Sequence, residues 1–184
     1  MTARMLVDIK AFPSMKVANR RLNKLARRRG TGIRRIGTAV IDGVLQYVYT
    51  SGPRLPASLT QHETEITQLL LGFDTDNYRR HGVPFHADWE MWIGELRYLG
   101  ENERATNNRA HIYRKCRKLA EADATILWVC ADPADMRRKI RWTKLVHDKS
   151  LYALFDDVVA DAHGPVWRFA DGVVTDLPRA LERV

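Results

Sequence analysis

Cysteine is scarce in this 184-residue chain, which contains only Cys116 and Cys130. Two cysteines are too few for a disulfide framework, and they fit a reducing compartment. The chain also lacks any run of about 18 uncharged apolar residues, so we expect no transmembrane helix. Residues 1–15 do not have the pattern of a signal peptide. These absences predict a cytoplasmic protein that does not contact membranes.

Motifs that would identify a function directly are also missing. The sequence contains no internal repeat, no phosphate-binding glycine loop and no low-complexity tract. His81, His86 and Asp88 lie close together, but no second cluster completes the four ligands of a structural zinc ion. Function therefore has to be inferred from charge, hydrophobic pattern and the placement of acidic residues.

Acidic residues are rare near the start of the chain. Residues 1–54 contain 12 Lys and Arg but 2 Asp and Glu, a net charge of +10. Residues 55–184 contain 18 Lys and Arg and 20 Asp and Glu, a net charge of −2, which gives +8 for the whole chain. A basic segment on a nearly neutral body indicates a polyanionic partner, and DNA is the first candidate. A solvated basic face with no partner is the alternative.

This basic segment predicts a helix followed by a β-hairpin. Ser14 is a good N-cap for the helix, and Gly30 is a good stop. Apolar residues recur from Ala18 at i, i+4, i+7 and i+8, which gives the helix one buried face. Asp42-Gly43 between apolar dipeptides is a strong hairpin signal.

A helix, a basic turn, a helix and a two-stranded ribbon form the layout of a winged helix-turn-helix. The segment ANRRLNKLARRRG resembles the last helix of that module, and YVYTSG resembles the end of its wing. Because the first helix is short or absent, we expect a partial winged helix over residues 1–52. A plain basic helix packed on a hairpin is the alternative. The residues expected to bind DNA are those whose side chains suit bases and phosphates, Lys16, Asn19, Arg20, Asn23, Arg27, Arg34 and Arg35.

The remaining chain has the pattern of an α/β domain. Residues 51–58 are rich in proline and glycine and are the best candidate for a linker. A helix is predicted over residues 59–71. The continuous apolar run at 124–130 is typical of a buried central strand. We therefore expect a second domain over residues 59–184.

Residues 88–118 predict a strand, a tight turn at Gly94, a second strand and a basic helix. If the strands pair as a hairpin, Asp88 and Glu101 lie near the same end of the ladder. Glu101 and Glu103 point the same way, because side chains alternate between the faces of a strand.

Three converging carboxylates repel one another unless protons or a divalent cation neutralise them. Mg²⁺ and Mn²⁺ suit oxygen ligands. The sequence therefore predicts a metal site formed by Asp88, Glu101 and Glu103. An amphipathic hairpin with exposed acidic residues is the alternative.

The pattern resembles the nuclease core of the PD-(D/E)XK superfamily. There, an Asp at a strand end and an acidic residue on the next strand hold a metal, and a Lys follows two residues later. In this chain Ala87 precedes Asp88 where Pro is usual, and Glu103 stands where the Lys is usual. In some relatives the Lys lies on the following helix, so the resemblance implies Lys115 or Lys118 in that role.

The same resemblance implies a glutamate on the first helix that faces the metal. Glu65 is the candidate for this position, and Glu63 is the alternative. Either residue is otherwise a solvated helix acid. The catalytic set implied by the resemblance is Glu65, Asp88, Glu101, Glu103, Lys115 and Lys118.

The order of wing, helix, acidic hairpin, basic helix and apolar strand resembles the replication-relaxation proteins of bacterial plasmids and integrative elements. The resemblance implies a restriction-endonuclease-like α/β domain with a mixed sheet. It also implies DNA binding in plasmid or mobile-element replication or mobilisation, with Mg²⁺ or Mn²⁺ in an endonuclease site. The rival hypothesis is a non-catalytic DNA-binding replication or transcription factor, whose decayed nuclease-like fold serves for homodimerisation. The rival is favoured because Glu103 stands where the superfamily usually has a lysine.

Overall fold

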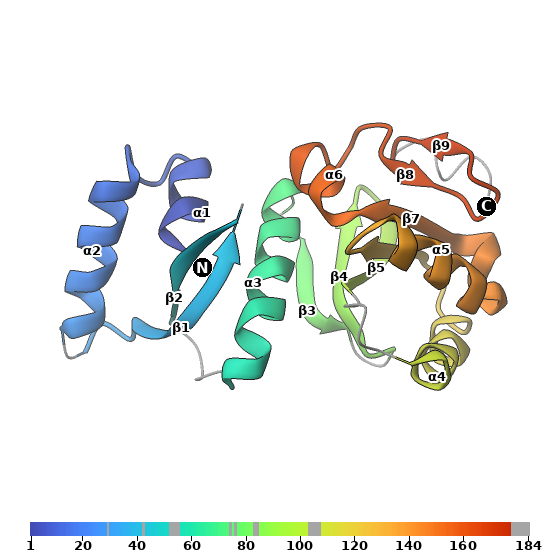
Figure 1. The fold of residues 1–184 in the computed structure, drawn as a ribbon, viewed down its shortest axis with the longest axis horizontal. Coiled ribbons are helices and arrows are strands. Elements are labelled where there is room, and N and C mark those ends of the chain that lie inside the picture. Colours follow the sequence, from blue (N-terminus) through green and yellow to red (C-terminus); the bar gives the residue numbers. More distant parts are fainter. Residues whose placement is uncertain are drawn as a thin grey trace. The chain divides into compact units, whose positions relative to one another are not determined.

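The computed structural model of the chain divides into two compact units, Met1–Gln68 and Leu69–Val184 (Figure 1). The division falls within helix α3 (Ala57–Gly72), so that helix contributes to both units. The structure describes residues 1–28, 30–41, 43–51, 56–73, 75, 77–82, 85–102 and 108–177. Most of the predicted linker at 51–58 lies outside these ranges, so its role as a domain boundary stays a prediction.

The first unit contains two short helices, a hairpin and most of α3. Its elements are α1 (Ala3–Asp8), α2 (Met15–Arg27), β1 (Arg34–Ile41) and β2 (Val44–Thr50). The Ser14 hydroxyl accepts a hydrogen bond from the Val17 amide at 3.4 Å, which confirms the predicted N-cap of α2. Ala18 and Leu22 form the buried face of that helix, as their spacing predicts.

Strands β1 and β2 pair antiparallel, and their outer edges also have partners. On the side of β2, Thr2 forms a bridge with Val48, and the Tyr49 amide donates to the Met1 carbonyl at 2.9 Å. On the side of β1, the Gln61 side chain from α3 accepts from the Val40 amide at 2.8 Å and donates to the Val40 carbonyl at 3.1 Å. These contacts satisfy outward-facing backbone groups of Val40 and Tyr49 inside the unit.

The second unit contains a seven-stranded mixed sheet in the order β3-β4-β5-β6-β7-β8-β9. Strands β3 to β5 pair antiparallel, β5 to β7 pair parallel, and β7 to β9 pair antiparallel. This confirms the predicted α/β class with a mixed sheet. The strands are β3 (Tyr78–Gly82), β4 (Ala87–Ile93), β5 (Leu96–Asn102), β6 (Thr125–Cys130), β7 (Ser150–Leu154), β8 (Trp167–Arg168) and β9 (Val174–Thr175).

Helical crossovers join the parallel strands, because parallel neighbours cannot be joined by a tight turn. Helix α4 (Arg109–Leu119) connects β5 to β6, and α5 (Pro133–Trp142) followed by η1 (Lys144–Lys149) connects β6 to β7 (Figure 1). The Asn108 side chain caps α4 by accepting from the His111 amide at 2.9 Å. A short helix, α6 (Phe155–Ala160), follows β7.

Strand β6 is the centre of the core. All six of its residues are buried, as the apolar run at 124–130 predicts for a strand covered on both faces. On one face, Ile126, Trp128 and Cys130 pack in a cluster with the apolar side of α4. Within the described residues, no helix has both the length and the apolar character needed to cross a membrane.

This topology determines which residues share an edge of the sheet. Strand β4 runs antiparallel to β5, whereas β6 and β7 run parallel to it. The start of β4 therefore lies beside the ends of β5 and β6. Asp88 is the second residue of β4 and Glu101 is the second-last residue of β5, so both lie at this edge.

A substitution at Gly100 would test how tightly the sheet packs beside Glu101. It pairs directly with Trp89, and a Cβ at residue 100 would lie 1.9 Å from the buried Trp89 ring. We expect Gly100→Ala to lower the free energy of unfolding by about 2–3 kcal/mol, because a buried indole has no room to move away. Urea denaturation measures the loss.

Gly72→Ala is the matched control for Gly100→Ala. Its new methyl would lie 3.5 Å from the Val158 carbonyl oxygen, which is an ordinary contact, and alanine suits a helix better than glycine. Equal stability losses in the two variants would show that Trp89 does not pack over Gly100.

Candidate functional site

Asp88 and Glu101 lie side by side on neighbouring strands. Trp89 pairs with Gly100, and Asp88 and Glu101 are each one residue further toward the same edge of the sheet. The Glu101 side chain is fully buried, and the Asp88 side chain is 18% exposed. Asp88 Oδ2 accepts a hydrogen bond from the Asn102 amide at 2.9 Å. The hairpin therefore holds two carboxylates at one place, and one of them has no contact with solvent.

Lys115 from α4 is the cation at these carboxylates. Its Nζ forms a hydrogen-bonded ion pair with Glu101 Oε2 and lies 3.8 Å from Asp88 Oδ1. Only 13% of the Lys115 side chain is exposed. Helix α4 buries Ile112 and Cys116 against the sheet, and Lys115 lies at the margin of that buried face. Of the two lysines proposed from the sequence, the structure brings Lys115 to the acidic pair.

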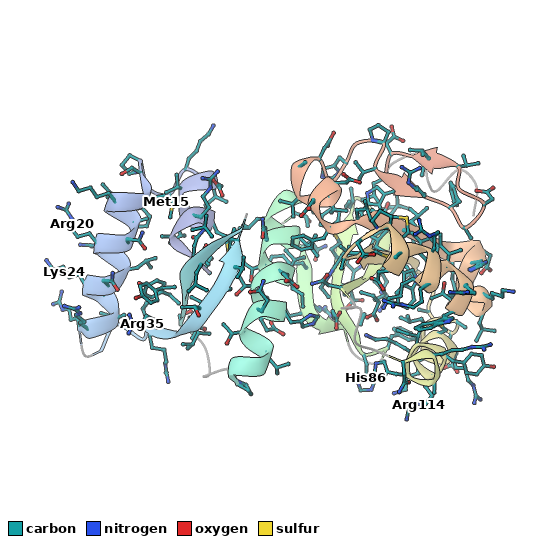
Figure 2. All side chains as sticks on the ribbon, viewed as in Figure 1. Met15, Arg20, Lys24, Arg35, His86 and Arg114 are labelled. Atoms are coloured by element: carbon teal, nitrogen blue, oxygen red, sulfur yellow. The ribbon has the colours of Figure 1, made fainter. Side chains whose placement is uncertain are left out.

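Lys118 lies instead in a pocket beside the acidic pair. The pocket has a volume of about 480 Å³. His86 and Arg114 project from the same side of this unit in Figure 2, and both line the pocket. The described residues that line it are Phe85, His86, His111, Arg114, Lys115 and Lys118.

Two buried charged residues near this edge were not anticipated from the sequence. Lys139 on α5 is 1% exposed, and Glu90 on β4 is also 1% exposed. The Glu90 Oε1 atom accepts from Arg97 Nε at 2.6 Å and pairs with Nη2 at 2.5 Å. Glu90 lies two residues after Asp88, so strand alternation could have indicated that both face the same side. Lys139 lies three residues after the buried Met136, which was the available signal for its burial.

The pKa of the Cys116 thiol responds to several of these charged groups. Burial raises the pKa of the Cys116 thiol to about 12, and the Glu101 carboxylate adds to the rise. The ammonium groups of Lys115 and Lys139 oppose it, so both lie within electrostatic range of the same thiol. A thiol with this pKa stays protonated at neutral pH and is a poor nucleophile. Cys116 is therefore excluded as a reactive group at this edge of the sheet, and the carboxylates and lysines remain.

The other residues of the predicted catalytic set have different positions. Glu103 lies outside the described residues. Glu65 is in the first unit, where its Oε1 accepts from Gln61 Nε2 at 2.8 Å, and Glu63 in the same unit is buried. Among the described residues, no three His, Cys, Asp or Glu side chains gather in a group that could hold a metal ion. Asp88 and Glu101 are the two predicted metal ligands that the structure brings together.

Helix α2 presents a strongly basic surface in the first unit. Lys16, Arg20 and Arg27 are exposed, as are Arg21 and Lys24, which were not among the predicted DNA contacts. In Figure 2, Arg20 and Lys24 project from the same side of the helix. A second pocket, of about 350 Å³, is lined by Phe12, Val17, Arg20, Arg21 and Lys24.

The remaining predicted DNA contacts differ in their environments. Asn19 and Asn23 are half-buried, and Asn23 Oδ1 accepts from the Tyr49 hydroxyl at 2.8 Å. Arg34 and Arg35 on β1 are exposed. The Arg35 guanidinium lies 4.5 Å from the centre of the Tyr47 ring. Asn23 thus contributes to packing between α2 and β2, whereas the arginines remain accessible.

Comparisons with protein-family models, curated proteins and solved structures found no match to this chain.

The Lys115–Glu101 pair makes a direct prediction about stability. Removing one partner of a buried ion pair leaves a buried charge, which costs about 3–5 kcal/mol. We expect Lys115→Met to lower the free energy of unfolding by this amount, and Lys115→Met/Glu101→Gln to recover most of it. Urea unfolding of the two variants and the wild type measures the difference.

Lys118→Met is the control for this experiment. Lys118 lies on the same helix but is exposed and has no acidic partner among the described residues, so we expect a change within about 0.5 kcal/mol. Similar losses for the two lysines would refute a special role for Lys115.

Proposed function

We propose that this protein binds DNA and cleaves its phosphodiester bonds with Mg²⁺ or Mn²⁺ at Asp88 and Glu101. The observation that carries the proposal is the convergence of two carboxylates and Lys115 at one edge of the sheet. An Asp near a strand end, an acid on the next strand and a Lys on the following helix match the pattern that the PD-(D/E)XK resemblance implies. The mixed sheet also fits that resemblance.

The donor set fits a hard divalent cation. Asp88 and Glu101 both supply oxygen atoms, which Mg²⁺ and Mn²⁺ prefer. Both carboxylates interact with the same ammonium group, so they are placed to share one cation. When bound, the metal would polarise the phosphate and lower the pKa of a coordinated water.

The chain's own groups have separate tasks in this proposal. The Asn102 amide holds one oxygen of Asp88 and fixes the direction in which the other oxygen points. Lys115 gives up its contacts with the carboxylates and stabilises the negative charge that develops on the phosphate. The burial of Glu101 strengthens these interactions, because charges attract more strongly away from water.

The layout of the first unit supports DNA binding. The Thr2–Val48 bridge, helices α1 and α2 and the β1–β2 hairpin follow the order of a winged helix-turn-helix that lacks its first helix. In such a module α2 would enter the DNA groove and the hairpin would be the wing. The exposed Arg20 and Arg27 would then bind phosphates.

The non-catalytic rival is supported by the same ion pair. Lys115 neutralises Glu101 through an ion pair, and Glu103 stands where the lysine is usual. In that case the acidic edge would only hold α4 on the sheet, and DNA binding would be the whole function. A role in plasmid or mobile-element maintenance is compatible with either form of the proposal.

The DNA-binding proposal predicts the effect of losing two arginines of α2. Each lost phosphate contact reduces the salt dependence of log Kd by about one unit. We expect Arg20→Ala/Arg27→Ala to weaken duplex binding and to lower this slope by about two units. Fluorescence anisotropy at several salt concentrations measures both quantities.

Arg4→Ala is the matched control for DNA binding. Arg4 is exposed on α1, and its guanidinium is paired with Asp8 at 3.0 Å. Its removal should change affinity little. Unchanged binding by the α2 double variant would exclude this helix from the interface.

The metal-site proposal predicts both a stability effect and an activity. Mn²⁺ should raise the melting temperature of the wild type, because it binds only the native site. Asp88→Asn should abolish this shift and any plasmid nicking, while keeping an oxygen that can accept from the Asn102 amide. Calorimetry and gel assays over a Mn²⁺ titration give the two readouts.

Glu121→Gln removes an exposed carboxylate two residues after the end of α4 and should retain both effects. A wild type that shows neither a metal-dependent shift nor nicking would establish the non-catalytic rival.

A further inference from the structure

One face of helix α4 lines the pocket beside Asp88 and Glu101. His111, Arg114, Lys115 and Lys118 follow the spacing i, i+3, i+4 and i+7, which places them on one side of a helix. Phe85 and His86, just before β4, form the opposite wall. Among the described residues, the pocket thus combines the Phe85 ring with five basic or titratable side chains.

The charges around this pocket are only partly neutralised. Lys115 has two carboxylate partners, but Arg114 and Lys118 have no acidic partner within the described part of the chain. Both are exposed, so their positive charges are accessible to an incoming group. The pocket volume, about 480 Å³, lies in the range of about 300–1,000 Å³ typical of ligand sites. An anion about the size of a nucleotide unit therefore fits its size and charge.

The backbone at His86 is a second, independent observation. His86 has a φ of +58°, in the left-handed region that residues other than glycine seldom adopt. Such strain persists where the surrounding structure or a function requires it. The strained residue lines the pocket directly.

The Phe85 ring, next to His86, is held by a charged neighbour. The Arg97 guanidinium lies 5.3 Å from the centre of this ring, and Arg97 is itself held by the buried Glu90. The aromatic wall is thus held in place by a buried ion pair.

We propose that this pocket binds a terminal phosphomonoester of a nucleotide, at the end of a nucleic-acid strand or on a free nucleotide. Arg114 and Lys118 bind the phosphate, and the Phe85 ring contacts the sugar or base. A phosphomonoester carries close to two negative charges at neutral pH, so the two cations of Arg114 and Lys118 select it over a singly charged internal phosphodiester. The proposal deepens the proposed nucleic-acid function by defining the form of substrate, but it needs neither metal nor cleavage.

The test compares short single strands of one sequence, labelled at the 3′ end, that carry either a 5′-phosphate or a 5′-hydroxyl. Binding to the full chain is followed by fluorescence anisotropy in EDTA, which removes any metal-dependent contribution. A strand labelled at its 5′ end that carries a 3′-phosphate or a 3′-hydroxyl, and competition by a nucleoside monophosphate or its nucleoside, separate the two strand ends and the free nucleotide. We expect at least one phosphorylated form to bind about tenfold more tightly than its hydroxyl counterpart.

Variants assign that preference to the pocket. Arg114→Ala and Lys118→Ala should each reduce the preference severalfold, whereas Arg117→Ala, on the same helix but outside the lining, should retain it. His86→Gly should reduce the preference while leaving the melting temperature equal or higher, because glycine accepts the left-handed backbone without strain.

Two results would overturn the proposal. The first is equal affinity of the wild type for phosphorylated and hydroxyl forms in every arm. The second is a loss of preference in Arg117→Ala as large as in Arg114→Ala, which would indicate general attraction by a basic helix. Because the assay contains no metal, a retained preference without plasmid nicking would leave this proposal standing and remove only the catalytic one.

Discussion

A carboxylate without solvent contact needs a cation nearby, and the Glu101–Lys115 ion pair satisfies that need. Its consequences extend across the second unit. Lys115 reaches Glu101 only because α4 crosses from β5 to β6 with Ile112 and Cys116 turned toward the sheet. The Asn108 cap sets where that helix begins. The ion pair therefore fixes the rotation of α4 about its own axis relative to the end of β5. The same rotation brings the pocket-lining side of the helix next to Asp88 and Glu101.

Much of the fold follows from local sequence signals. The apolar run of β6, the Ser14 cap and the turn at Gly94 act over a few residues, and each is found where the sequence predicts it. The hairpin that turns at Gly94 also brings Asp88 and Glu101 to one end of the ladder, as its pairing predicts. What local pattern could not provide is the choice between Lys115 and Lys118, which depends on the rotation of α4. The buried charges of Glu90 and Lys139 were missed because a charged residue is tolerated in a core only through tertiary partners.

The two units use similar chemistry in different structural settings. In the first, Phe12 lies beside Arg20, Arg21 and Lys24. In the second, Phe85 lies beside Arg114, Lys115 and Lys118. An aromatic ring beside several cations suits nucleotides, because the ring can stack on a base while the cations bind phosphate. In both units, basic side chains thus surround an aromatic ring. Each of these two pockets is lined by described residues of its own unit.

The covered edges of the β1–β2 hairpin limit how copies of this protein can associate. Exposed strand edges commonly recruit a strand from another molecule. Here Met1 and Thr2 occupy the side of β2, and the Gln61 amide binds both backbone groups of Val40 on the side of β1. An incoming strand would first have to displace these contacts, and the Gln61 amide would then need new partners. Strand pairing between hairpins of two copies is therefore disfavoured at Val40, Val48 and Tyr49.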